Sequence, residues 1–330
     1  MRVLVGFLLC FALVCLALAL GPTAARAADW PSQPVTMIVP FAPGGPTDVL
    51  ARVLQPFLAQ ELGQAVVVEN VPGGGGVAGA LRVAKAAVDS PLFVLGSVGT
   101  HAMSQSSHRK PPYSAADDFR PVILLADAPL VLAVRKDLPA SGLREFIAYA
   151  RANQAKMQFG SAGVGTSTHV GCVLLNQTLG VDVVHVPYRG GGPATQDLIA
   201  GRIDYLCSYV ANAVAAAKRG QAKVLATLAA TRVAAFADVS TAEEQGLAGF
   251  DISAWSAFFL PKSASNQAVA RLNAAASRAL DAPAVNERFR EIGFVAAARE
   301  RRAPEYLKRF VDSEIRKWAE PIRKSGVVED

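Results

Sequence analysis

The chain has 330 residues, of which 52% are hydrophobic, and a formal net charge of +6. This length is about twice that of a typical single domain, so we expect a large core divided between two domains. The weak positive charge suits small anionic ligands, and no cluster of Lys and Arg interleaved with aromatic residues indicates nucleic-acid binding.

The first 27 residues have the pattern of a secretory signal peptide. Arg2 precedes an apolar run at Val3–Leu20, and residues 25–27 supply a small-x-small cleavage site. The run reaches the lower limit for spanning a bilayer, but Gly21-Pro22 and the cleavage pattern favour removal over an uncleaved anchor. No lipoprotein or twin-arginine signal accompanies it. We therefore expect export to the periplasm in unfolded form, without a preloaded cofactor.

Cleavage would leave 33 minus 2, or 31, basic residues against 27 acidic ones, a net charge of about +4. Of the four cysteines, only Cys172 and Cys207 lie in the expected mature chain. An oxidising compartment would allow one disulfide between them. We nevertheless expect two free, buried thiols.

A strand, a glycine turn and a helix follow one another near the start of the mature chain. Apolar residues at Val35–Val39 precede a Pro-Gly-Gly turn at Pro43–Gly45, and helical periodicity begins directly after it. Glycines let a ligand approach the backbone, and the first N–H groups of a helix carry partial positive charge. The segment therefore predicts an anion site. Asp48 is expected to brace this turn, with ligand contact the weaker alternative, and Pro56 predicts a kink or an early helix end.

Short apolar runs alternate with helical patterns along the rest of the chain, which predicts an α/β fold with largely parallel sheets. The last helix carries an apolar stripe that is typical of a face packed on the core. A second strand-turn unit is expected at Val66–Gly76. Further strands are expected at Leu92–Gly96, Val122–Leu125, Leu130–Val134, Met157–Phe159, Val183–Val186, Ile203–Cys207 and Val224–Leu228, and helices at Ala78–Ala87, Leu143–Arg151, Thr195–Ala200, Asn266–Leu280, Val285–Ile292 and Pro304–Lys324.

Two more glycine-rich turns each join an expected strand to an expected helix. The first is GSAGVGTSTH at Gly160–His169, and the second is HVPYRGGGPA at His185–Ala194. Open α/β sheets bind ligands at such strand ends. Each hydroxyl of the first turn is more simply explained as a helix cap, but the whole cluster favours a ligand site. In the second turn, Tyr188 could cover a ligand and Arg189 could pair with a carboxylate.

The sequence contains no complete catalytic or cofactor-binding motif. Gly74, Gly76 and Gly79 satisfy G-x-G-x-x-G, but Pro72 and Gly73 separate them from the strand and no acidic residue closes the next one. A G-x-S-x-G nucleophile turn is absent, and the four histidines lack metal-ligand spacing. We therefore expect neither cofactor nor metal, and a protein that is not an enzyme.

These motifs together resemble those of the Bug-type extracytoplasmic solute-binding proteins of tripartite tricarboxylate transporters. The resemblance runs from Trp30-Pro31 through VPFAPGGPTD, LGQAVVVENVPGGGG, SAGVGTSTH and HVPYRGGGPA to Asp204, Glu244-x-Gly246 and Trp255. It implies a periplasmic-binding-protein (type II-like) fold of two α/β lobes with a ligand cleft between them. The lobes would comprise residues 28–130 with 250–330, and residues 131–249.

The resemblance also implies the ligand class and the site. Family members bind small mono-, di- or tricarboxylates, largely through main-chain groups and bridging waters, and deliver them to membrane permease subunits. Loops Phe41–Gly45 and Ser161–Thr166 would hold the proximal carboxylate. Residues Tyr188–Gly191 and residues near Ser97–His101 would bound the distal end. The implied ligand-binding residues are Phe41, Ala42, Pro43, Gly44, Gly45, Asp48, Ser97, Thr100, His101, Ser161, Ala162, Gly163, Thr166, Ser167, Tyr188, Gly190 and Gly191.

Three points stay open in the sequence. The run at Val88–Leu92 departs from the family pattern, which leaves the ligand unidentified. A receptor that presents its ligand to a sensor kinase is an alternative to a transporter subunit. A periplasmic hydrolase using Ser161 or Ser97 with His169 or His101 is the alternative from another class. We take a monomer as the default state of a shuttle.

Overall fold

The structure is a computed structural model that describes residues 30–87 and 90–326. The expected signal peptide and part of the unusual run at residues 88–92 lie outside these residues. Within them, no helix is both long and apolar enough to cross a membrane.

The strands are β1 (Val35–Val39), β2 (Val66–Asn70), β3 (Leu92–Ser97), β4 (Phe119–Arg135), β5 (Gln158–Ser161), β6 (Val184–Pro187), β7 (Tyr205–Tyr209), β8 (Ala222–Thr227), β9 (Ser253–Pro261) and β10 (Val295–Ala296). The helices are α2 (Pro46–Leu62), α3 (Val77–Ala84), α4 (Ser104–Ser107), α5 (Leu143–Asn153), α6 (Ser167–Leu179), α7 (Gly191–Ile199), α8 (Val210–Lys218), α9 (Asn266–Asp281), α10 (Pro283–Ile292) and α11 (Pro304–Ser325). Short helical turns are η1 (Gly74–Gly76), η2 (Gly99–Met103), η3 (Gln154–Lys156), η4 (Ala234–Phe236) and η5 (Arg299–Arg301).

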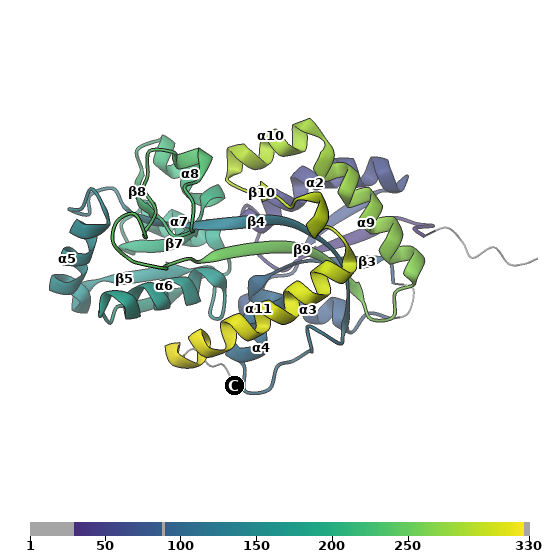
Figure 1. The fold of residues 1–330 in the computed structure, drawn as a ribbon, viewed down its shortest axis with the longest axis horizontal. Helices are drawn as coiled ribbons and strands as arrows, with labels where there is room; N and C mark the ends of the chain where they lie inside the picture. Colours follow the sequence, from purple (N-terminus) through teal and green to yellow (C-terminus); the bar gives the residue numbers. More distant parts are fainter. Residues whose placement is uncertain (1–29, 88–89, 327–330) are drawn as a thin grey trace, which may run out of the picture.

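The molecule has two α/β lobes joined by long crossing strands (Figure 1). The described strands pair in the order β2-β1-β3-β9-β4-β7-β5-β6, with β8 and β10 also paired to β4. Neighbours within each lobe are parallel, as in β1 with β2 and β3 or in β5 with β6 and β7. The crossing strands β4 and β9 are antiparallel to their partners. The expected α/β fold is confirmed, while parallel pairing is limited to the individual lobes.

Strand β4 belongs to both lobes. Its residues up to Pro129 pair with β9, and from Leu130 it pairs with β7 and β8. The sequence predicted two strands here, and this is wrong. The backbone stays extended between them because Asp127 is paired with β9 on one side and β10 on the other. Strand β9 itself was not expected.

Helix α2 has the ends that its sequence predicts. Pro46 occupies the first turn, where its missing N–H costs nothing, and Gly63 closes the helix at φ 70°. Of the two outcomes predicted at Pro56, a kink or an early end, the early end is wrong, because α2 continues to Leu62. A buried face that includes Leu54 and Leu58 on either side of the proline holds the two halves together.

Helix α11 packs its apolar stripe on the core, as predicted, and contacts α6 of the other lobe. It is also tied to the crossing strand β9. The indole N–H groups of Trp255 and Trp318 both donate to Glu314 Oε2, at 3.0 and 3.1 Å. Charged-group hydrogen bonds of this kind satisfy a carboxylate that is almost fully buried.

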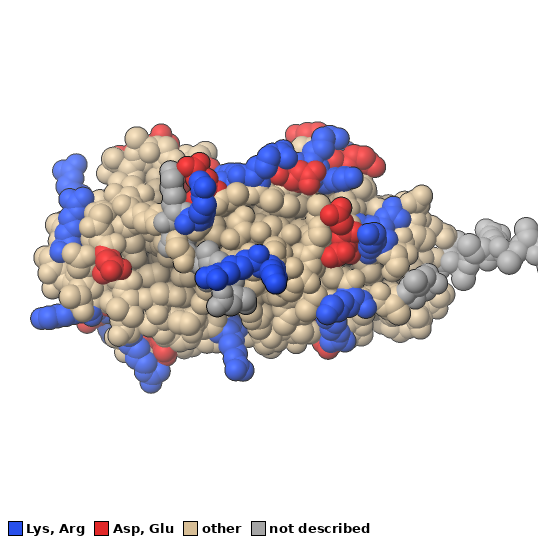
Figure 2. Space-filling model, turned by 90° about the horizontal axis from the view of Figure 1, so that it is seen from below, with Lys and Arg blue, Asp and Glu red and all other residues tan. Residues whose placement is uncertain are grey.

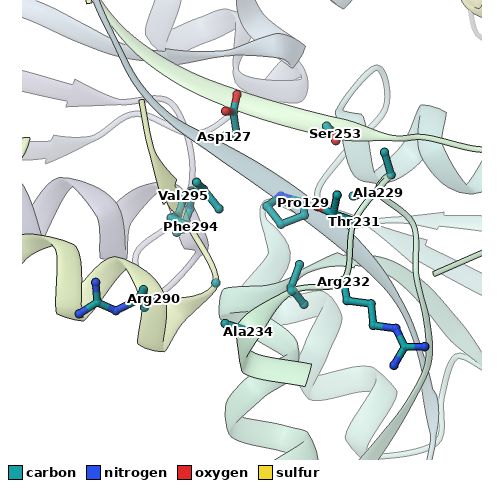
Figure 3. Close-up of a pocket in the computed structure, with 13 residues that line it drawn as sticks. Asp127, Pro129, Ala229, Thr231, Arg232, Ala234, Ser253, Arg290, Phe294 and Val295 are labelled. Carbon is teal, nitrogen blue, oxygen red and sulfur yellow. The ribbon is translucent and has the colours of Figure 1, made fainter. Parts of the chain in front are cut away.

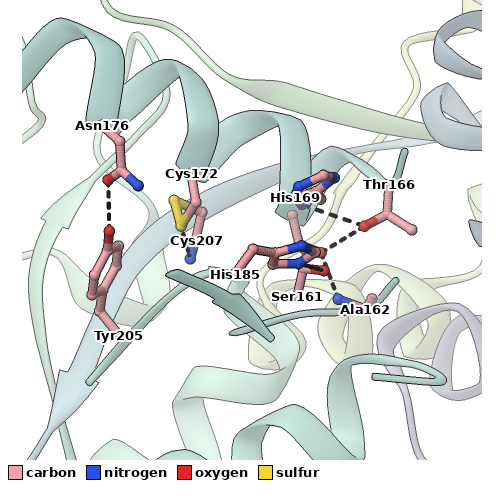
Figure 4. Close-up of a disulfide and its surroundings, with 10 residues drawn as sticks. Ser161, Ala162, Thr166, His169, Cys172, Asn176, His185, Tyr205 and Cys207 are labelled. Atoms are coloured by element: carbon pink, nitrogen blue, oxygen red, sulfur yellow. Dashed lines mark hydrogen bonds between the residues drawn. A yellow bond between two sulfur atoms is a disulfide. The ribbon is translucent and has the colours of Figure 1, made fainter. Parts of the chain in front are cut away.

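A disulfide joins α6 to β7, so the expectation of free thiols is wrong (Figure 4). Cys172 and Cys207 have Cα atoms 5.3 Å apart, within the range that the bond requires. Their separation of 35 residues carries no information about distance. The packing of α6 on β7 brings them together.

Candidate functional site

The loops at the carboxyl ends of strands from both lobes meet in one place. Strands β1 and β3 contribute from the first lobe, and β5, β6 and β7 from the second. The N-termini of α2, α6 and α7 follow these loops, so their free N–H groups converge there. The cavity between them is lined by Phe41, Pro46, Thr47, Ser97, Gly99, Ala162, Thr166, Ser167, Gly191 and Tyr209.

The first loop, Phe41–Gly45, is held by Asp48. Asp48 Oδ2 accepts from Gly44 N at 3.0 Å and from Arg52 Nε at 2.9 Å. Asn70 Nδ2 donates to Asp48 Oδ1 and to Phe41 O. Burial raises the pKa of Asp48, but the hydrogen bonds from these partners outweigh burial and hold the pKa below its ordinary value. Asp48 therefore braces the loop, as expected, and does not line the cavity.

Replacing Asp48 by Ala should lower the free energy of unfolding by about 2–3 kcal/mol, because the loop loses a buried, charged acceptor that binds three donors. Urea denaturation measures this change. Arg52→Ala is the matched control, since the Arg52 side chain is 54% exposed and its ion pair should contribute less than about 1 kcal/mol. Equal losses in the two variants would contradict the bracing role.

The second loop, Ser161–Thr166, is held by hydroxyl groups. Thr166 caps α6, since its Oγ1 accepts from His169 N and donates to Gly163 O. Ala162 N donates to Thr168 Oγ1 at 2.9 Å. Ser161 is only 1% exposed and its Oγ lies 3.1 Å from both Gly163 N and Gly163 O. Thr166 and Ala162 line the cavity, while Ser161 lies behind it.

A hydroxyl pair completes this wall, and sequence reasoning predicted one member of it, Ser167, but missed the other, Tyr209. Tyr209, the last residue of β7, has its hydroxyl 2.6 Å from Ser167 Oγ, and burial raises the pKa of Tyr209 to about 12. Both residues line the cavity. The signal was available, because Tyr209 follows an expected strand at the same sheet edge as the glycine turns. Pro46, Thr47 and Gly99 were also missed.

The third turn, His185–Ala194, contributes to the cavity wall through its glycines. Gly191 lines the cavity, and a Cβ built on Gly190 would lie 3.4 Å from Ala42 Cβ in the first lobe. Tyr188 does not line the cavity; its hydroxyl donates to Asp197 Oδ2 at 2.8 Å. Arg189 is exposed.

The expected distal residues separate into two groups. Ser97 lines the cavity, whereas Thr100 and His101 are fully buried behind it. Thr100 Oγ1 accepts from Ser97 N, and the His101 ring stacks on Phe259 with centroids 3.8 Å apart. Burial lowers the pKa of His101 to about 3.

The lobes touch across the cavity, which has a volume of only about 10 Å³. This is room for about one water molecule. A Cβ on Gly75 would lie 2.4 Å from Val164 O in the opposite lobe, and one on Gly99 would lie 3.7 Å from Thr166 Cα. An organic acid can enter only if these loops move apart.

These features match a known family. The model of the tripartite tricarboxylate transporter family receptor, TctC, matches residues 50–327. The chain belongs to the TctC family. It is similar to MatC (Rpa3494) from Rhodopseudomonas palustris with bound malate, with 40% identity, a TM-score of 0.86, and coverage of 89% of this chain and 100% of MatC.

Two further solved structures support this assignment. The periplasmic binding protein BugD is 32% identical, with a TM-score of 0.88 and coverage of 91% and 100%. R. palustris Rpa4515 with adipate is 31% identical, with a TM-score of 0.86 and coverage of 90% and 99%. The resemblance to Bug-type proteins is therefore confirmed, and this TctC chain is a solute-binding receptor.

A second, larger cavity of about 530 Å³ lies between α10 and residues 229–234 (Figure 3). Two of its three charged lining residues have partners in the receptor: Asp127 binds Arg301 at 2.6 Å, and Arg232 binds Glu244 at 2.9 Å. Among its described lining residues, none belongs to the N-terminus of an α-helix. Among residues 30–87 and 90–326, no cluster of three His, Cys, Asp or Glu could hold a metal ion.

Proposed function

We propose that this receptor captures a small dicarboxylate between its lobes in the periplasm and delivers it to the membrane subunits of a tripartite tricarboxylate-type transporter. The observation that carries the proposal is the meeting of three helix N-termini at one interlobe cavity. The malate and adipate held by the two R. palustris proteins support the ligand class. The receptor would act as a monomer.

The chemistry of the cavity suits an anion that is bound without a counter-charge. None of its ten lining residues is charged. The first N–H groups of α2, α6 and α7 and the hydroxyls of Thr47, Ser97 and Ser167 supply the donors. On the face seen in Figure 2, basic and acidic side chains are interspersed over uncharged surface.

Two observations support the periplasmic location. The disulfide between Cys172 and Cys207 suits an oxidising compartment. The first 27 residues have the signal-peptide pattern described above, and we propose that they are removed on export.

Thermal denaturation with a panel of C4 to C6 dicarboxylates tests the proposal. A ligand at a hundredfold excess over its Kd should stabilise the receptor by about 2.7 kcal/mol, which raises Tm by roughly 5 °C. Gly99→Val should abolish this shift, because its side chain would occupy the space facing Thr166 and Ser167 N. Gly142→Val, an extended glycine before α5, should leave the shift intact.

Two results would contradict the proposal. The function is wrong if no carboxylate raises the Tm of the wild-type protein. The assignment of this cavity as the ligand site is wrong if Gly99→Val binds a dicarboxylate as tightly as Gly142→Val does.

The hydrolase alternative has one observation in its favour. Ser161 Oγ lies 2.7 Å from His185 Nε2, a pairing that a nucleophile and its base require. The histidine is not one of the two that the sequence suggested. Burial of Ser161 and its contacts with Gly163 leave no approach for a substrate, so receptor function fits the geometry better.

A further inference from the structure

Two histidines stack behind the second cleft loop. His169 lies in the first turn of α6 and His185 on β6, and their ring centroids are 3.8 Å apart with an interplanar angle of 14°. Phe159 of β5 stacks on His185 at 4.8 Å. Figure 4 shows the two imidazoles side by side, next to Ser161 and Thr166. His169 is 5% exposed and His185 is half-buried.

Each ring forms a hydrogen bond with one end of the loop Ser161–Thr166. His185 Nε2 lies 2.7 Å from Ser161 Oγ, at the end of β5. His169 Nδ1 accepts from Gly165 N at 3.1 Å, just before the cap of α6. Ala162, which lines the cavity, lies between these two attachment points in the sequence. Thr166, which also lines the cavity, directly follows Gly165.

The bond to Gly165 determines the state of one ring. A backbone N–H can only donate, so His169 Nδ1 must be unprotonated and the ring proton must lie on Nε2. Burial lowers the pKa of His169 to about 3, with the neighbouring His185 adding to the effect, and burial lowers the pKa of His185 to about 4. Both rings are therefore neutral near pH 7.

We propose that His169 and His185 are positioning residues that hold the loop Ser161–Thr166 in its ligand-binding shape through one hydrogen bond each. This inference rests on the proposed function, because it assigns the loop a ligand. Neither ring lines the cavity, so both act through the backbone and hydroxyl groups they hold. Ligand affinity should depend on the bonding nitrogen of each ring rather than on the bulk of the ring.

Paired substitutions separate bonding from packing. His169→Asn places an oxygen near the Nδ1 position and His185→Gln places a polar atom near the Nε2 position, whereas Leu at either site keeps bulk and removes the bond. All four variants lose the ring stack, so all should lose stability. Malate affinity should fall about tenfold in His169→Leu and His185→Leu, the equivalent of one hydrogen bond, and stay within about threefold in His169→Asn and His185→Gln.

Amide hydrogen exchange at Gly165 supplies a readout that needs no ligand. Exchange should be at least about tenfold faster in His169→Leu than in wild type, and near wild type in His169→Asn. The proposal is overturned if Asn and Leu variants lose the same affinity and the same protection, because packing alone would then explain the histidines. If wild type binds no carboxylate but the exchange pattern holds, the loop is positioned as inferred and the proposed function has failed. The His185 pair repeats the affinity test if a His169 variant does not fold.

Discussion

Lowering the pH from 7.5 to 5 should reduce the free energy of unfolding by about 6 kcal/mol, through three histidines that are buried or partly buried. Burial lowers the pKa of His101 and His169 to about 3 and the pKa of His185 to about 4 in the folded chain, against an ordinary value of 6.5. Above pH 6.5 these histidines are neutral in both the folded and the unfolded chain and add no pH dependence. Below it, the unfolded chain binds three protons that the folded chain does not, so stability falls as pH falls.

Each histidine should contribute about 2 kcal/mol over this interval, because stability changes by about 1.4 kcal/mol per pH unit for each proton. Urea denaturation at the two pH values measures the total. His101→Leu should remove about a third of the pH dependence, whatever it does to stability at pH 7.5. An unchanged urea midpoint between pH 7.5 and 5 would show that the rings are protonated in the fold.

Removing the disulfide should also lower the free energy of unfolding by several kcal/mol. Cys172 and Cys207 close a loop of 35 residues, and restricting such a loop in the unfolded chain stabilises the fold by about 4 kcal/mol in the chain-entropy treatment. The double variant Cys172→Ala with Cys207→Ala should lose this amount. Chemical denaturation measures the loss, and wild type refolded in reductant should match the double variant.

The location of the disulfide adds a second expectation. It ties α6 to β7, the same two elements whose Ser167 and Tyr209 hydroxyls pair in the cavity wall. Cys207 N also donates to Cys172 Sγ. Equal stability of the oxidised and reduced forms would show that packing alone holds α6 on β7.

The loops of the candidate site could be predicted because their signals are local. A strand followed by glycines and a helix start places free N–H groups at a strand end whatever the rest of the chain does. Three such turns pointed to one edge, and cavity-lining residues come from all three. The bracing role of Asp48 followed in the same way, since it is separated from Gly44 by four residues.

The errors concern residues whose environment depends on distant parts of the chain. Tyr188 and His101 were expected to contact a ligand, but in the structure Tyr188 donates to Asp197, His101 stacks on Phe259, and neither lines the cavity. The break expected within β4 is absent because β9 and β10 pair along it. Pairing energy from outside a segment overrides its own preference.

The sequence by itself determined the strand–turn–helix units, the helix caps and the family, because hydrogen bonds and backbone preferences over a few residues decide these. Only the tertiary structure decided that Cys172 meets Cys207, that His185 rather than His169 binds Ser161, and that the Tyr209 hydroxyl pairs with Ser167. These contacts join residues 24 to 42 positions apart. Their distances depend on how helices and strands pack together, and no local pattern records that packing.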